Sequence, residues 1–323
     1  MPANLVKIAA APVCALVWLG GQGTRAIAAL VVFGIAIPPA GRLLKPYVAE
    51  AIFLLLVASF LRVDLTLLRG YLRRPGLVLA AAAWTMLAVP LISGGAWSLA
   101  GLDQASPDIY LALILQAVAS PMMASPALAA VMGLDATLVL VTLVIGTALV
   151  PLTAPIFVYL FLGSALTLSP LVLGAKLLAI LSGSLVVAGA IRWQIGGDQI
   201  KRHAPLIDGI NVLVLFVFVS AVMENVAGEI LSDPLRVLSL TILSFAVFFA
   251  MIGLTALIFR GSGYGRAMAL GLMVAQRNMG LMVAATGGVL PDTAWLFLGL
   301  SQLPIYLSPQ LLKPIVQRLV PPV

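Results

Sequence analysis

Apolar residues fill most of the chain in long runs, and short polar connections separate these runs. Ten runs are close to or above the roughly 20 residues that a helix needs to cross a bilayer. The predicted spans cover residues 25–41, 47–63, 76–99, 107–131, 134–161, 168–194, 205–228, 233–259, 264–290 and 293–316. The pattern therefore predicts an all-α integral membrane protein with ten transmembrane helices.

A further apolar run, within residues 1–24, precedes the first predicted span. Lys7 and the stretch from Ile8 to Leu19 have the arrangement and length of a signal peptide. A second apolar run starts at Ala26 and more spans follow, which favours an extra apolar lead-in helix over a cleaved peptide. We expect this helix to lead into a membrane domain over residues 25–318.

Five spans in each half predict two inverted repeats, residues 25–161 and 168–316. An odd number of spans turns the second copy over in the membrane, as in many secondary transporters. Corresponding spans are interrupted in both halves, span four by the prolines between Ser120 and Pro126 and span nine by polar residues at Gln276 to Asn278.

The composition excludes an ordinary soluble globular protein. Of the residues, 62% are hydrophobic and 9% are charged, against about a quarter charged in soluble domains. The net charge of +7 does not indicate a nucleic-acid partner, because Lys and Arg fall mostly in connections between spans. The expected surrounding is a lipid bilayer.

Basic residues also predict the orientation. If the spans alternate, four basic groups share one side, which we expect to be the cytoplasm. These groups are Arg62, Arg69, Arg73 and Arg74; Arg192, Lys201 and Arg202; Arg260 and Arg266; and Lys313 and Arg318, whereas the other side carries Arg42, Lys45 and Arg236. Both ends of the ten-span core are then cytoplasmic, in what we expect to be a bacterial inner membrane.

No residue pattern predicts an enzyme. The single cysteine, Cys14, excludes an intramolecular disulfide and a multi-cysteine metal site, and the single histidine, His203, lies in a polar connection. Acidic residues lie near span ends, and no paired acids, activated nucleophile or metal cluster appears inside the spans. We therefore expect no catalytic residue.

Arg277 lies in the middle of span nine, between Gln276 and Asn278. A charge near the bilayer centre costs on the order of 3 kcal/mol or more and nearly always faces a cavity or a partner. Two interpretations stay open. Arg277 binds an anionic ligand, or it has a structural role and satisfies carbonyls of span four or pairs with an acid.

Pro121 and Pro126 predict an interruption in span four, because each removes a backbone donor and disfavours helix at the residue before it. A simple kink is the alternative. An interruption at membrane depth persists only where protein or a water-filled cavity covers it, and half-helix ends there hold ions and substrates. Ser120, Ser125 and Thr142 add hydroxyl groups nearby.

The chain resembles the bile acid:sodium symporter family over residues 25–318. The resemblance rests on the span spacing and on four motifs. These are Leu68-Arg69 to Arg74-Pro75-Gly76, Ser120-Pro121-Met122-Met123-Ala124-Ser125, Gly133-Leu134-Asp135 and Gln276-Arg277-Asn278-Met279-Gly280-Leu281. It implies two inverted five-helix repeats with discontinuous helices 4 and 9 that cross. It also implies a panel of helices 1, 2, 6 and 7 and a core of helices 3–5 and 8–10.

The resemblance implies sodium ions beside the crossing and an organic anion in the adjoining cavity, yet the motifs depart from the family. Met273 stands where the family has a sodium-binding glutamate, and Arg277 where it has a glutamine. Ser125, Asn278 and, if the loop is one residue shorter, Thr142 remain as sodium ligands. A guanidinium offers only donors, so we expect Arg277 to take the electrostatic place of the ion.

These observations predict a secondary transporter that moves a small organic anion by alternating access. Two alternatives stay open, a sodium-dependent symporter with an altered ion site and a membrane-embedded binding or receptor protein without transport. The predicted substrate- or ion-binding residues are Ser120, Ser125, Thr142, Gln276, Arg277 and Asn278. Na⁺ is the only cofactor that the sequence suggests. Bile acids, keto acids and pantoate-like acids all fit as substrates.

Overall fold

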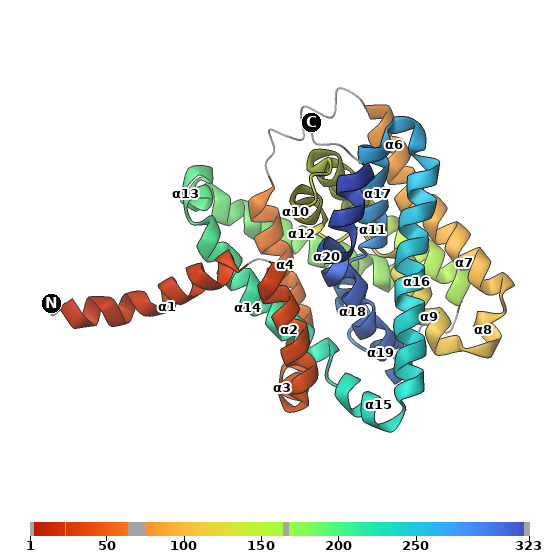
Figure 1. The fold of residues 1–323 in the computed structure, drawn as a ribbon, viewed down its shortest axis with the longest axis horizontal. Helices are drawn as coiled ribbons and strands as arrows, with labels where there is room; N and C mark the ends of the chain where they lie inside the picture. The colour runs from red at the N-terminus through yellow and green to blue at the C-terminus, as the bar shows by residue number, and fades with distance from the viewer. Residues whose placement is uncertain (1–2, 23, 64–74, 164–167, 320–323) are drawn as a thin grey trace. The chain divides into compact units, whose positions relative to one another are not determined.

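A computed structural model describes residues 3–22, 24–63, 75–163 and 168–319, and within these ranges the chain forms helices and no strand (Figure 1). Among the described residues, six helices are long and apolar enough to cross a membrane, which agrees with an all-α integral membrane protein. They are Pro38–Arg62, Pro75–Leu99, Ala136–Leu162, Pro170–Ile195, Ala204–Ser232 and Pro234–Ile258. Leu68, Arg69, Arg73 and Arg74 of the predicted basic connection lie outside the described residues.

The chain divides into two compact units, Met1–Val63 with Leu181–Ala227, and Asp64–Ile180 with Gly228–Val323. Two helices, α12 (Pro170–Ile195) and α15 (Val226–Ser232), belong partly to each.

The first unit is built around α14, which packs against α1, α2, α3 and α4. Its helices are α1 (Ala3–Gly21), α2 (Thr24–Ala36), α3 (Pro38–Leu44), the 3₁₀ turn η1 (Lys45–Tyr47), α4 (Val48–Arg62), α13 (Gly197–Arg202) and α14 (Ala204–Val222). The expected N-terminal helix is present as α1. It approaches α14 closely, because a side chain at Gly209 would meet the Leu16 carbonyl.

The predicted boundary between spans one and two is wrong. The chain turns at Ile37, and a continuous helical segment then runs from Pro38 to Arg62. Proline favours the first turn of a helix and disfavours helix at the residue before it, which explains the turn. Arg42 and Lys45 therefore lie within this helix instead of in a connection, where both pair with Glu224, at 3.7 and 2.9 Å.

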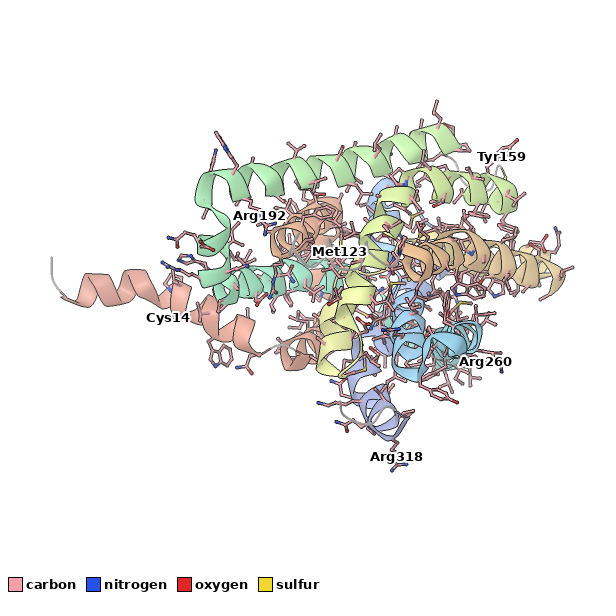
Figure 2. All side chains as sticks on the ribbon, turned by 90° about the horizontal axis from the view of Figure 1, so that it is seen from above. Cys14, Met123, Tyr159, Arg192, Arg260 and Arg318 are labelled. Carbon is pink, nitrogen blue, oxygen red and sulfur yellow. The ribbon has the colours of Figure 1, made fainter. Side chains whose placement is uncertain are left out.

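The second unit contains the interrupted spans. Its helices are α6 (Pro75–Ala83), the π-helix η2 (Trp84–Ala88), α7 (Val89–Leu99), α8 (Leu102–Ala105), α9 (Pro107–Val118), α10 (Ser125–Val131), α11 (Ala136–Leu162), α16 (Pro234–Ile258), the 3₁₀ turn η3 (Arg260–Ser262), α17 (Tyr264–Ala275), α18 (Met279–Ala285), α19 (Asp292–Leu300) and α20 (Gln302–Leu319). Figure 1 shows α16 running beside α17, and Figure 2 shows Arg260 at the turn that joins them.

Three predicted spans of this unit are divided into shorter helices. Residues 107–131 form α9 and α10, residues 264–290 form α17 and α18, and residues 293–316 form α19 and α20. No part of these is both long enough and apolar enough to be among the six membrane-spanning candidates. Span four is therefore interrupted and not merely kinked, and span nine is interrupted at the polar triplet. Figure 2 shows Met123 at the interruption of span four.

Candidate functional site

The two interruptions pair with each other through their backbones. The Met122 N–H donates to the Gln276 carbonyl at 2.7 Å, and the Asn278 N–H donates to the Ser120 carbonyl at 2.8 Å. Pro121 and Arg277 thus face each other as an isolated antiparallel β-bridge. Two strand-like segments inside a helical unit satisfy each other's backbone groups, which lipid cannot do.

Local sequence explains where each helix stops and restarts. Before Pro121, Ala119 leaves helical geometry with φ −63° and ψ 150°, and α10 restarts at Ser125 with Pro126 in its first turn. In span nine, α17 ends at Gln276, and Asn278 starts α18 by accepting the Leu281 N–H on its side-chain oxygen at 3.1 Å. Asparagine is a favoured N-cap residue because its side-chain oxygen satisfies such a donor.

Arg277 is 3% exposed and donates to two backbone carbonyls. Its Nη1 lies 2.8 Å from the Ala119 oxygen and 3.3 Å from the Thr85 oxygen, and its Nη2 lies 3.2 Å from the Thr85 oxygen. The Ala119 carbonyl belongs to the C-terminus of α9. Arg277 thus makes the contact to span four that its structural interpretation expected.

The Thr85 carbonyl is available because of a π-helical turn. In η2 the Val89 N–H donates to Trp84, five residues back. The next residue, Pro90, has no N–H to give to Thr85. Arg277 supplies the missing donor, and so holds span three, span four and span nine together.

The surroundings of Arg277 favour a cation without supplying a full countercharge. Helix C-termini carry partial negative charge, and Arg277 lies beside those of α9 and α17. No carboxylate of a described residue lies within 4.0 Å of its guanidinium, so pairing with an acid is not observed in that part of the chain. Within the described residues, backbone carbonyls are thus what stabilises the charge of Arg277.

Gln276 is fully buried, and its side-chain nitrogen donates to the Ser308 hydroxyl of α20 at 3.0 Å. Ser120, Ser125 and Thr142 are also fully buried. Within the described ranges their hydroxyl oxygens have no hydrogen-bond partner. Among the described residues, Ser120, Ser125 and Thr142 therefore supply buried oxygens that could bind a ligand.

These oxygens fit a sodium ion only in part. The hydroxyls of Ser125 and Thr142 lie on α10 and α11, which pack against each other. The side-chain oxygen of Asn278 already accepts the Leu281 N–H, and the side chain of Met273 has no oxygen. Among the described residues no group of three or more acidic, His or Cys side chains could hold a metal.

Sequence reasoning missed four residues around Arg277. Arg277 binds the Thr85 carbonyl, which lacks a donor within the helix because Pro90 has no N–H. Ser93 and Gln116 line a small pocket beside it. A proline in the middle of span three and a lone amide in the apolar run before Ser120 are the signals that point to them.

No protein-family model matches this chain, and no curated protein is significantly similar to it. The resemblance to the bile acid:sodium symporter family consequently rests on the span spacing and the four sequence motifs alone.

Proposed function

We propose that this protein is a secondary transporter that moves a small organic anion by alternating access, with a fold like that of the bile acid:sodium symporter family. The observation that carries the proposal is the backbone pairing of the interruptions at Pro121 and Arg277 inside one apolar unit. Interrupted helices in membrane proteins mark the binding sites of secondary transporters. Alternating access would need parts that move relative to each other, and the chain divides into two compact units.

Arg277 supports an anionic substrate. Its charge is buried among backbone carbonyls, with no carboxylate beside it in the described part of the chain. A buried cation attracts an anion strongly, because the low-dielectric interior screens charge less than water does. The buried hydroxyls of Ser120, Ser125 and Thr142 would contribute further hydrogen bonds to a ligand at the crossing.

We propose further that Arg277 takes the electrostatic place of a sodium ion. Its guanidinium would replace the ion as the cation that binds backbone carbonyls, those of Thr85 and of Ala119 at the C-terminus of α9. Transport would then run without sodium. In keeping with the distribution of Lys and Arg, the protein would lie in a bacterial inner membrane with both ends of its ten-helix core in the cytoplasm.

A thermal-shift screen of the purified protein tests substrate class and coupling together. Taurocholate, pyruvate and pantoate would be added in sodium and in choline salts, because a ligand of the folded state raises Tm by mass action. We expect one of these anions to raise Tm equally in both salts. A rise that requires sodium contradicts the proposed role of Arg277.

A sodium-dependent symporter is the second candidate. The hydroxyls of Ser125 and Thr142, which have no partner among the described residues, favour it, because hydroxyl oxygens are suitable ligands for a hard cation. Solute counterflow in liposomes separates both transporters from a binding or receptor protein, since only a transporter exchanges internal for external solute.

A further inference from the structure

A small pocket lies beside Arg277 in the second unit, and its lining does not include Pro121, the other residue of the backbone bridge. Its lining comes from one face of α7, the C-terminal end of α9, the middle of α16 and the end of α17. Val89, Ser93 and Trp97 are spaced four residues apart on α7, so they share that face. The walls are mostly apolar and include Phe248 and Met251.

Three polar side chains line this pocket, and all are buried. Ser93 is 4%, Gln116 5% and Arg277 3% exposed. Within the described residues, the Ser93 hydroxyl and the Gln116 side-chain oxygen have no hydrogen-bond partner. A serine in a helix commonly bonds a carbonyl of the preceding turn, so a hydroxyl without that bond inside an apolar wall indicates a ligand.

The charge and size of the pocket define that ligand. Three of the five guanidinium N–H groups of Arg277 donate to Thr85 and Ala119, and two remain. The Gln116 amide presents either its oxygen or its nitrogen to the pocket by rotation. The free space in this partly open pocket is about 10 Å³, close to what one water-sized group occupies.

We infer that this pocket binds a single small inorganic anion of the halide class, held by Arg277, Ser93 and Gln116. The anion neutralises a buried charge that backbone carbonyls stabilise but do not cancel. A carboxylate group would offer the same charge, so the experiments below compare chloride with acetate. The inference does not depend on transport.

Bromide tests the site directly, because its anomalous scattering locates it in a structure of the wild-type protein. We expect one bromide peak between Arg277, Ser93 and Gln116. In parallel, Tm measured in potassium chloride should exceed Tm in potassium gluconate at equal ionic strength and saturate with chloride. No bromide peak, or equal Tm in the two salts, would show a water site and overturn the inference.

Two matched serine variants separate the pocket from general salt effects. Ser93→Ala should weaken the apparent chloride affinity about tenfold, the loss expected for one hydrogen bond to a charged group. Ser220→Ala, at another buried serine whose hydroxyl has no partner among the described residues, should leave it unchanged. Equal effects of both variants, or stabilisation by potassium acetate and not by chloride, would contradict a halide site. A result that contradicts the halide site would not contradict the proposed transport, because these experiments measure only anion binding.

Discussion

At the scale of single residues, Arg277 joins three segments through carbonyls that helix geometry leaves without donors. One belongs to Ala119 at the end of α9, and the other to Thr85, where Pro90 interrupts the helical hydrogen bonds. A buried acceptor without a donor costs about 1–3 kcal/mol. Arg277 therefore has a structural role that is separate from its positive charge.

A double-mutant cycle between Arg277 and Pro90 tests this role. Arg277→Gln should lower the free energy of unfolding by about 2 kcal/mol, because carbonyls lose their donor. Pro90→Ala restores an N–H that can bond Thr85 in the π-helical register. The loss caused by Arg277→Gln should then be about 1 kcal/mol smaller in the Pro90→Ala background. Unfolding in detergent measures both values, and strictly additive effects would contradict the account.

Asn278 is the N-cap residue of α18. Asn278→Ala should reduce stability by about 1 kcal/mol, whereas Asn278→Ser should retain most of it, because serine also caps helices. Thermal unfolding of the two variants provides the comparison. If serine proves as harmful as alanine, the side chain of Asn278 has a role other than capping.

At the scale of helices, the interruptions follow from sequence because their causes are local. Pro121 and Pro126 remove donors, and Gln276 to Asn278 place polar groups where a lipid-facing helix has none. The π-helical turn at Thr85 and its contact with Arg277 depend on packing between segments far apart in the chain. The helix boundary at Ile37 was missed because the continuous apolar run hid the effect of Pro38.

The pairing of α16 with α17 gives a prediction at this scale. A side-chain carbon at Gly271 would lie 2.8 Å from the Ile252 carbonyl oxygen, too close without separating the helices. Gly271→Ala should therefore cost about 1–3 kcal/mol, as overpacking does. Gly253 in α16 has nothing within 4 Å of such a carbon, so Gly253→Ala is the matched control. Equal stability of the two variants would contradict the observed packing.

At the scale of the whole molecule, six long apolar helices agree with an integral membrane protein. The chain also pairs two interrupted spans at a buried cation. Sequence predicted both interruptions and the residues at them, but not which carbonyls Arg277 binds. Ten spans, inverted repeats and anion transport remain proposals that follow from these features taken together.

Transport by Arg277 variants tests the central claim most directly. The anion with the largest thermal shift among taurocholate, pyruvate and pantoate would be measured in liposome counterflow, with sodium and with choline. We expect equal exchange by the wild type in both salts, reduced exchange by Arg277→Lys, which keeps the charge, and loss of exchange in Arg277→Gln. Sodium-dependent exchange that is the same in the wild type and in folded Arg277→Gln would contradict the account.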